Sequence, residues 1–521
     1  MNNDLIVGID LGTSTTEIAV IKDGKPMLLS NSSGMKIIPS VVGLDDEDNW
    51  VAGERARAQL LLSPEKTAAE IKRLIGSGEL VALGSRTYTP VELSAKLLEY
   101  VKTFAAQSLG EEITKAVISV PAYFDEIKRQ ETVLAGQLAG LTVERILNEP
   151  TAAALSYGLE HLDEESHVLV YDLGGGTFDV TLLEMFEGVL EVKASGGDNK
   201  LGGKDFDERL IEWMAQNFLK KTGVDLKNDV YAMSRLKEEA ERCKKELSEK
   251  ESVRINIPFI AEKQGRPLSI SEELTREQFE RMTADLLERT HAPIRRVLSD
   301  SGLSASDIDK VILVGGSTRM TAVSKDIRDF LNIIPEPAVD PDLAVAEGAA
   351  IQAGIIGGVI DNESSLVFTD VNPYSLGIRT VYGITNDHMS VLIRRNTTIP
   401  VTKKDTFRTT YDYQNKVDIE VYQGESEIAS HNHFLGSFHI KDVPERKAGR
   451  EKIEVDFSYD LNGMLRVEAI WNVRYWKRKK TEISSLPAIP ARKPVNSFRR
   501  ISAFFTGLRS FKDGRAGQER L

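Results

Sequence analysis

The feature that most constrains the fold is a stretch of sequence that occurs twice. Residues 9–20 read IDLGTSTTEIAV, and they align without a gap on residues 171–182, YDLGGGTFDVTL. In each copy an apolar run leads to Asp-Leu-Gly, a turn of glycine and hydroxyl residues follows, and an apolar run returns. Glycine inside a strand pattern usually marks a sharp turn or close approach by a ligand. The repetition predicts one hairpin duplicated in two related halves.

The two predicted hairpins have the chemistry of a phosphate site. Backbone N–H groups of a glycine-rich turn can surround phosphate oxygens, and an aspartate at a strand end can hold a divalent cation through its water shell. Asp10 and Asp172 occupy that place in the two copies. A tight hairpin without a ligand would leave the same pattern in either copy alone. Two copies facing each other would hold one polyphosphate from both sides.

Other segments support a nucleotide site between two lobes. Glu149-Pro150 and Asp340-Pro341 each open an alanine-rich stretch, which predicts two helices that cross closely and form a hinge, with ordinary helix packing as the alternative. Glycine pairs occur in LGGKDF (201–206) and in VILVGGSTR (311–319), where a strand runs into a helix start. The predicted helix 235–248 is charged on most faces. It is either a solvated helix or a wall for a purine and ribose, because four of its polar residues share one face.

Composition restricts the compartment and the fold. The 521 residues are 41% hydrophobic and 28% charged, enough for more than one packed domain. A single cysteine, Cys243, excludes an intramolecular disulfide and a cysteine-ligated metal site, and fits a reducing compartment. The N-terminus has no basic or apolar leader, and the most membrane-like stretch, 344–360, contains Glu347. These features predict a cytoplasmic protein without a membrane span.

The net charge of −13 is unevenly distributed. From Arg474 onward the chain has 13 Lys or Arg and 3 Asp or Glu, so the part before it is strongly acidic. An acidic body argues against nonspecific binding of nucleic acid. The basic tail, 474–521, is rich in proline, serine and glycine and lacks helical periodicity, which predicts a disordered extension, with binding to acidic partners as the alternative. Residues 373–471 alternate polar and apolar side chains around an Asn462-Gly463 turn, which predicts an antiparallel sandwich.

Several longer stretches carry a resemblance to a known family. They are GIDLGTST (8–15), IKRLIG (71–76), VISVPAYFDEIKRQ (117–130), RILNEPTAAALSYGL (145–159), DLGGGTFDV (172–180), LGGKDFD (201–207), VILVGGSTRM (311–320), TDVNPYSLGI (369–378) and RNTTIPV (395–401). On these motifs the chain resembles the DnaK-type heat-shock 70-kDa chaperones, and among them most closely the HscC-like bacterial branch. The resemblance extends from the N-terminus to about Asn472.

The resemblance implies an architecture and a function. Residues 1–361 would form an α/β, actin-like, two-lobed ATPase domain, 362–371 a linker, and 372–473 an all-β sandwich that binds peptides. The family continues into a helical lid, whereas here the basic tail 474–521 follows, so the lid is expected to be absent and peptides to leave faster. A shifted reading frame or a truncated gene product would also explain the tail. The segment between Gly76 and Pro90 is short for the family, which suggests a trimmed lobe.

The implied function is ATP-dependent folding of proteins in the stress response. Extended apolar segments of unfolded proteins would bind, and ATP hydrolysis, stimulated by a J-domain co-chaperone, would control their release. Need for an exchange factor is left open, and no membrane or specific nucleic acid is expected as a partner. A nucleotide-dependent regulator with weak foldase activity is the alternative, and a sugar kinase of the same broad fold is a distant third.

The resemblance also implies roles for individual residues, with ATP or ADP, Mg²⁺ and K⁺ as cofactors. Asp10 and Asp172 would hold Mg²⁺ through water, Lys72 would lie beside the γ-phosphate and the attacking water, and Glu149 and Asp179 would complete the metal and water shell. Surface charge for Lys72 and a helix cap for Glu149 are the alternatives. Contacts to the phosphates would come from Gly12, Thr13, Ser14, Gly174, Gly175 and Thr177. The rest of ADP would contact Gly202, Gly203, Glu241, Lys244, Lys245, Ser248, Gly315, Gly316, Ser317, Arg319 and Asp342.

For the sandwich and its coupling to the ATPase the implied residues are as follows. The peptide groove would use Ile378, Thr380, Val381, Phe407, Thr410, Val417 and Ile419, with Val417 as the central pocket and core packing as the alternative. The linker would dock through Leu366, Val367 and Phe368, with a buried edge strand as the alternative. Thr369 departs from the usual leucine-rich pattern.

Pro121 and Arg129 would relay the signal between the ATPase and the sandwich, and Arg145 and Asp370 would contact a J-domain partner. His431 and His433 lack a third ligand, so no metal is expected there.

Overall fold

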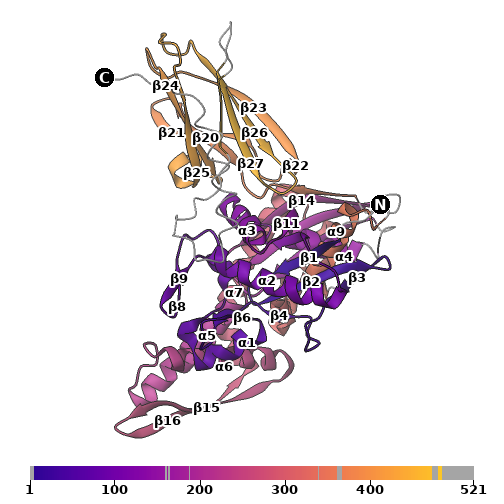
Figure 1. Ribbon diagram of the computed structural model, residues 1–521, viewed down its shortest axis with the longest axis vertical. Helices are drawn as coiled ribbons and strands as arrows, with labels where there is room; N and C mark the ends of the chain where they lie inside the picture. The colour runs from indigo at the N-terminus through magenta and orange to yellow at the C-terminus, as the bar shows by residue number, and fades with distance from the viewer. Residues whose placement is uncertain are drawn as a thin grey trace. The chain divides into compact units, whose positions relative to one another are not determined.

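Both repeated stretches fold into the predicted hairpins. The first joins β1 (Ile6–Leu11) to β2 (Thr15–Lys22), and the second joins β12 (Ser166–Leu173) to β13 (Phe178–Phe186). Asp10 is paired with Glu17 in the first hairpin, and Asp172 with Asp179 in the second. The computed structural model (Figure 1) describes residues 5–158, 161, 165–186, 188–337, 340–360, 367–471 and 479–483. The hairpins have the same register, as a duplication requires.

Each hairpin lies within a larger sheet, and the two sheets share one strand arrangement. The first sheet has the order β11-β10-β1-β2-β3, with β4 also paired to β2, and the second has the order β18-β17-β12-β13-β14-β19-β22. In both, the first strand of the hairpin has a parallel neighbour, and the second strand has an antiparallel one. The added strands are β3 (Lys25–Leu28), β4 (Ile38–Pro39), β10 (Lys115–Val120), β11 (Thr142–Asn148), β14 (Val189–Asp198), β17 (Lys310–Val314), β18 (Glu336–Pro337), β19 (Val367–Val371) and β22 (Thr398–Ile399). The duplicated α/β unit is thus confirmed.

The two small-residue helices cross at close range. They are α4 (Glu149–Gly158) and α9 (Ala344–Ile356). A Cβ atom on Gly348 would lie 1.7 Å from the carbonyl oxygen of Ala152, so only glycine permits this crossing. Helix α9 begins later than the predicted Asp-Pro start, because the Asp340 carbonyl first accepts hydrogen bonds from Leu343 and Ala344 in a turn. The predicted close crossing is confirmed.

Further helices and small strands complete the two lobes (Figure 1). The helices are α1 (Glu54–Leu62), α2 (Pro90–Leu109), α3 (Glu126–Leu138), α5 (Gly203–Thr222), α6 (Val230–Glu249), α7 (Arg276–Ser301) and α8 (Thr321–Leu331). The strands are β5 (Val42–Leu44), β6 (Trp50–Ala52), β7 (Thr67–Ala68), β8 (Val81–Leu83), β9 (Arg86–Tyr88), β15 (Ser252–Lys263) and β16 (Arg266–Thr275). Helix α2 begins with a capping box between Thr89 and Glu92, which satisfies N–H groups of its first turn. Among helices of the described ranges, none combines the length and apolar character needed to cross a bilayer.

The described residues between 376 and 483 contain the predicted antiparallel sandwich. One sheet has the order β21-β20-β24-β25 and the other β23-β26-β27-β28. The strands are β20 (Leu376–Tyr382), β21 (Thr385–Ile393), β23 (Val401–Arg408), β24 (Lys416–Gln423), β25 (His433–Lys441), β26 (Lys452–Tyr459), β27 (Leu465–Trp471) and β28 (Lys479–Ile483). Gly463 has a φ of +68° in the turn between β26 and β27, as the Asn-Gly pair predicts.

Strand β28 corrects the predicted disorder of the tail. It lies within 474–521 and pairs antiparallel with β27, where its backbone completes the edge of the second sheet. The rest of that segment lies outside the described residues, and so does the expectation of a missing lid.

The predicted linker contains a strand. Strand β19 pairs in parallel with β14 and antiparallel with β22, so it has a neighbour on each side and is not an edge strand. Its role as a linker stays a prediction. Leu366 lies outside the described residues, and Val367 is described only by its backbone pairing with Val189.

Candidate nucleotide-binding site

Four carboxylates from distant parts of the chain meet beside the two hairpins. Asp10 ends β1, Asp172 and Asp179 lie on the second hairpin, and Glu149 begins α4. Burial raises the pKa of Asp10 to about 6 and that of Asp179 to about 7, and the charge of Glu149 raises both. Burial also raises the pKa of Asp172, and Glu149, Asp179 and Asp10 add to that rise. Buried carboxylates that repel one another in this way are stabilised by a cation.

Lys72 supplies positive charge to this cluster. It lies on the 3-10 helix Ile71–Leu74, is 6% exposed, and forms an ion pair with Glu149. Its Nζ atom is 5.7 Å from the centre of the Phe124 ring. The burial of this ion pair argues against two alternatives, a surface charge for Lys72 and a plain helix cap for Glu149. The residues expected to carry the chemistry thus lie together.

Short hydrogen bonds fix two of the carboxylates. Ser119 Oγ donates to Asp10 Oδ1 at 2.6 Å, and the backbone N–H of Tyr123 donates to Asp179 Oδ1 at 3.0 Å. Ser119 lies near the end of β10 and Tyr123 in the loop that follows it, so this part of the first lobe positions a carboxylate of each hairpin. Sequence reasoning did not include Ser119, although its place at the end of a buried strand beside β1 is a usable signal.

The turns of the two hairpins face each other at van der Waals distance. A Cβ atom on Gly175 would lie 2.2 Å from Ser14 Oγ, and one on Gly176 would lie 2.7 Å from Thr13 Oγ1. On the other side, a Cβ atom on Gly202 would lie 2.4 Å from the backbone nitrogen of Gly176. Gly175 and Gly176 are therefore required by the close approach of side chains of the first hairpin, and Gly202 by the close approach of the Gly176 backbone, which explains why a strand pattern contains glycines. The predicted opposition of the two hairpins is confirmed.

The donor set fits a magnesium-bound polyphosphate. Carboxylates and hydroxyls are the ligands that Mg²⁺ prefers, and it usually keeps several waters. Within the described ranges no three His, Cys, Asp or Glu side chains converge to ligate a metal directly. Asp10 and Asp172 are the residues that could hold such a cation, beside the glycine turns of the two hairpins.

The polar face of α6 divides into two parts. The Nζ atom of Lys244 donates to Asp207 and, at 3.0 Å, to the carbonyl oxygen of Gly203, so it braces the glycine pair at the start of α5. Ser248 Oγ donates back to the carbonyl of Lys244 at 3.2 Å. Lys245 is largely exposed and pairs with Glu241. Lys244 thus supports the backbone of the site, and its contact with the nucleotide stays a prediction.

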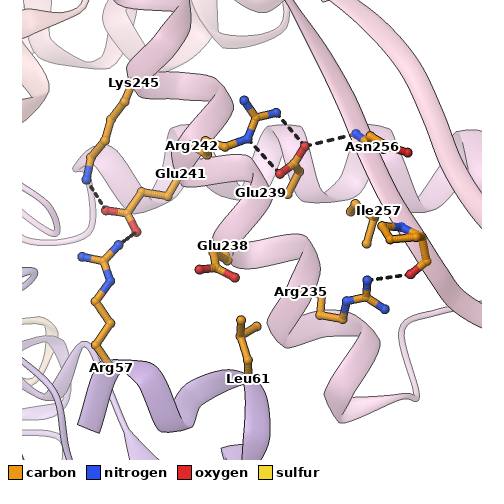
Figure 2. A pocket seen from close by; sticks show the side chains of 11 residues that line it. Arg57, Leu61, Arg235, Glu238, Glu239, Glu241, Arg242, Lys245, Asn256 and Ile257 are labelled. Carbon is orange, nitrogen blue, oxygen red and sulfur yellow. Dashed lines mark hydrogen bonds and ion pairs between the residues drawn. The ribbon is translucent and has the colours of Figure 1, made fainter. Parts of the chain in front are cut away.

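Glu241 joins the two lobes beside a cavity of about 530 Å³. Its carboxylate accepts from Arg57 of α1 at 3.0 Å and from Lys245 at 2.8 Å (Figure 2). Burial alone would raise the pKa of Glu241, but Lys204, Lys245 and Arg57 together lower it to about 2. Of the predicted nucleotide residues, Glu241 and Lys245 line this cavity. The contact between α1 and α6 was not predicted, because nothing in the local pattern around Arg57 indicates its distant partner.

A second contact between the lobes was also missed. Arg73 follows Lys72 and donates to both carboxylate oxygens of Asp205, at 2.9 and 3.1 Å. Asp205 lies in the first turn of α5 and also accepts from the N–H of Gly202 at 2.8 Å. Both hydrogen bonds come from the Nη2 atom of Arg73, and this charged contact fixes the segment that carries Lys72 against the helix that carries the glycine pair.

The remaining predicted nucleotide residues follow β17. A Cβ atom on Gly315 would lie 2.5 Å from the carbonyl oxygen of Leu173, which places this glycine against the second hairpin. Ser317 Oγ donates to the carbonyl of Gly174 at 2.8 Å. Arg319 pairs with Asp342 at 2.7 Å and with Asp340 at 2.9 Å. Gly316 lies against Asp342 as well, since its Cβ would be 2.6 Å from Oδ1.

The residues predicted to bind peptide differ in burial. Ile378 and Ile419 are 4% and 2% exposed and belong to the core of the sandwich, so core packing describes them. Val417 and Phe407 pack against that core at partial burial, from opposite sheets. Thr380 is half-buried, whereas Val381 and Thr410 are exposed. A ligand therefore has access to the members of this set other than Ile378 and Ile419.

The predicted coupling residues lie where the sandwich contacts the ATPase. Pro121 is buried, and Arg129 is 3% exposed and donates to Asn148 Oδ1 at 2.6 Å. The guanidinium of Arg145 lies 5.5 Å from the centre of the Phe368 ring. A Cβ atom on Gly463, in the β26–β27 turn, would lie 3.1 Å from the guanidinium of Arg129.

Asp370 is 9% exposed, and its Oδ2 atom accepts from Asn148 at 2.9 Å and from Thr151 at 3.0 Å. Its Oδ1 atom accepts from the N–H of Val371 at 2.8 Å. These internal contacts hold β19 in place, and contact of Asp370 with a J-domain partner stays a prediction.

The fold and the site define an ATPase of the actin-like α/β class followed by a β-sandwich. A protein-family model described as Hsp70 protein matches residues 6–79 and 79–487. The chain belongs to the Hsp70 family. Members of this family are ATP-dependent chaperones that bind nucleotide with Mg²⁺, and they generally bind unfolded polypeptides and J-domain co-chaperones.

Proposed function

We propose that this chain binds extended apolar segments of unfolded proteins in its sandwich and releases them under the control of ATP hydrolysis. The observation that carries the proposal is the double pairing of β19. This strand belongs to the same sheet as the second hairpin and also pairs with β22, which leads into the sandwich. A change at the phosphate site can therefore reach the sandwich through one hydrogen-bonded sheet. Within the family, the motifs favour the HscC-like branch.

The buried cluster would perform the hydrolysis. Asp10 and Asp172 would hold Mg²⁺ through water, and bound Mg²⁺ neutralises charge on the phosphate oxygens. Lys72, already held by Glu149, would place its ammonium group beside the γ-phosphate and the attacking water. Glu149 and Asp179 would orient that water, and Thr177 would contact the phosphates. Positioned charges of this kind are typically worth about 3 to 4 kcal/mol of activation free energy each.

The sandwich would bind the peptide backbone and bury one or two of its apolar side chains. Val417 is the proposed pocket, because it is only partly buried and lies on β24 next to core residue Ile419. Val381 and Thr410, both exposed, would border the bound peptide. A J-domain co-chaperone would act near Arg145, which is partly exposed.

The test is release of a fluorescent apolar peptide, followed by anisotropy with ADP and then with ATP and Mg²⁺. We expect faster release with ATP and weak binding by Val417→Phe, whose added volume fills the pocket. Val391→Phe is the matched control, because Val391 lies on β21 of the same sheet and is 39% exposed. Peptide release that does not respond to nucleotide would refute the proposal and leave a nucleotide-dependent regulator.

A further inference from the structure

A lysine that the proposed function does not use lies beside the buried carboxylate cluster. Lys128 is on α3, and its Nζ atom is 5.0 Å from the centre of the Phe124 ring, which Lys72 also approaches, at 5.7 Å. The stem of Lys128 packs against the chain after Lys72, since a Cβ atom on Gly76 would lie 2.6 Å from Lys128 Cγ. The N–H of Gly76 donates to Glu131 at 2.6 Å, which fixes this contact. The ammonium group of Lys128 therefore has a defined position at the same aromatic ring as Lys72.

The ammonium group of Lys128 is half-buried, and it has no hydrogen-bond acceptor or ion-pair partner among the residues that the structure describes. Burial lowers the pKa of Lys128, and the charge of Lys200 lowers it further. Asp125 and Asp179 oppose this shift without cancelling it. Both carboxylates accept from a backbone N–H, Asp125 from that of Lys128 at 2.9 Å and Asp179 from that of Tyr123 at 3.0 Å. A half-buried ammonium group without a counter-ion is unfavourable, which favours a bound anion.

Lys200 brings a second positive charge to this place from the other lobe. It lies in the loop between β14 and α5, and in the described ranges its Nζ atom likewise has no ion-pair partner. The loop is fixed on both sides, because Asn199 donates to the carbonyl of Tyr123 at 2.6 Å and Arg289 donates to the carbonyl of Lys200 at 3.2 Å. Like charges that meet between two lobes repel each other unless an anion lies between them. Lys128 and Lys200 are therefore placed to share one anion.

The product of the proposed reaction has the chemistry that two lysines recognise. Hydrolysis breaks the bond between the γ-phosphorus and the bridging oxygen, water supplies the new oxygen, and ADP, inorganic phosphate and a proton result. The phosphate forms beside Lys72 and Asp179. Asp179 is also one of the charges that act on Lys128, so the two positions are neighbours. Inorganic phosphate carries more than one negative charge at neutral pH and has oxygens for several ammonium donors.

We propose that Lys128 and Lys200 form an exit site for inorganic phosphate, which holds the cleaved phosphate between the two lobes before it leaves for solvent. The inference rests on the proposed function, because this phosphate is a product of ATP hydrolysis. Its independent support is the pair of ammonium groups, one from each lobe, for which the described protein supplies no counter-ion. Neither lysine belongs to the predicted nucleotide contacts.

The test measures binding of radioactive inorganic phosphate to the full chain by equilibrium dialysis with ADP and Mg²⁺ present. Lys128→Gln and Lys200→Gln should each weaken the affinity for phosphate about tenfold, the factor expected when one charged hydrogen bond is lost. Lys220→Gln is the matched control, because it removes the same charge from an exposed position in the last turn of α5 and should bind phosphate as wild type does.

Three results would overturn the inference. The first is no saturable phosphate binding by wild type, and the second is equal affinity in wild type and Lys128→Gln. The third is an equal loss in Lys220→Gln, because the effect would then be general electrostatics. Repeating the dialysis with a non-hydrolysable ATP analogue fills the γ-phosphate position. Wild type should still bind one phosphate, and loss of that binding would show that phosphate occupies only the γ position and would also refute the exit site.

Two further measurements separate charge from packing and from the proposed function. Lys128→Arg keeps the charge, so its phosphate affinity should stay within about threefold of wild type; binding as weak as in Lys128→Gln would assign the loss to packing and refute the exit site. Cleavage of ATP by wild type, measured after acid quench, tests the proposed function by itself. If wild type cleaves no ATP, the proposed function fails. If it cleaves ATP and phosphate binding is unchanged by the substitutions, only the exit site fails.

Discussion

The contact between the sandwich and the ATPase should weaken as the pH rises, because it buries Glu126. The Oε1 atom of Glu126 accepts from the N–H of Leu465, at the start of β27, at 3.0 Å, and from Gln130 at 2.6 Å. Gln423 of the sandwich accepts from the backbone N–H of Glu126 at 3.4 Å. Burial raises the pKa of Glu126 to about 7, whereas its ordinary value is 4.5; the hydrogen bonds and Arg129 oppose the rise and Asp460 adds to it.

The direction and size of the pH effect on docking follow from the two pKa values of Glu126, about 7 when docked and 4.5 in water. When the sandwich separates, Glu126 meets water and its pKa returns toward 4.5, so the docked state binds more protons between pH 4.5 and 7. Docking is therefore unpenalised below pH 4.5, loses stability as the pH rises through this window, and carries the full cost above pH 7. A difference of about 2.5 between the two pKa values corresponds to about 3 kcal/mol. Glu126→Gln has no charge to bury and should dock with no such pH dependence.

Energy transfer between two dyes measures the docking directly. Labels on Glu112→Cys and Asp418→Cys would report it, since both positions are exposed and lie on the ATPase and the sandwich. Native Cys243 is buried, and burial raises the pKa of its thiol to about 12, so it should not react. Transfer in wild type should fall as the pH rises from 4.5 to 7 and change no further above pH 7, and transfer in Glu126→Gln should stay constant. The reasoning is refuted if both proteins show the same pH profile.

Three other changes test separate parts of the structure. Lys72→Met should lower the single-turnover rate of ATP hydrolysis by about 10² to 10³ with nucleotide affinity within about tenfold, because its charge acts on the transferred phosphoryl group; an equal loss of affinity would contradict that role. Arg57→Met should speed release of a fluorescent ADP by up to about fivefold, the range expected for a partly exposed ion pair, and Arg55→Met on the same helix should not. Gly348→Ala should lower the free energy of unfolding in urea by about 3 kcal/mol or more, because its methyl group would overlap the Ala152 carbonyl. A wild-type unfolding midpoint would rule out the close crossing.

Local and repeated patterns were readable from the sequence. The two hairpins, the small-residue helices and the sandwich follow from strand alternation, glycine placement and the spacing of acid-Pro pairs. The repeat also predicted that the hairpins oppose each other, because a duplicated unit packs around an approximate two-fold axis. The buried cluster of Asp10, Lys72 and Glu149 came from the family resemblance, and the geometry brings these residues together.

Long-range pairings were not readable. Arg57 meets Glu241 and Arg73 meets Asp205 across more than a hundred residues, and nothing near Arg57 or Arg73 in the sequence identifies the partner. Lys244 has the helical spacing predicted for a ligand residue. The sequence does not show that its Nζ atom contacts Gly203 and Asp207, because both of these residues lie on another helix, α5. Asp370 has the polarity of a surface residue, yet Asn148 and Thr151 bury it.

The double pairing of β19 makes separation of the sandwich a cooperative event. Separating β19 from the second sheet breaks its backbone hydrogen bonds to β14. Separating β19 from β22 breaks its backbone hydrogen bonds to that strand. When β19 loses one of these partners, its N–H and C=O groups cannot form replacement hydrogen bonds with water, because the neighbouring residues exclude water until the strand has left. Intermediate positions are therefore disfavoured, and the molecule should populate two distinct states whose ratio shifts with the occupant of the ATPase site, with no continuum of partly opened forms between them.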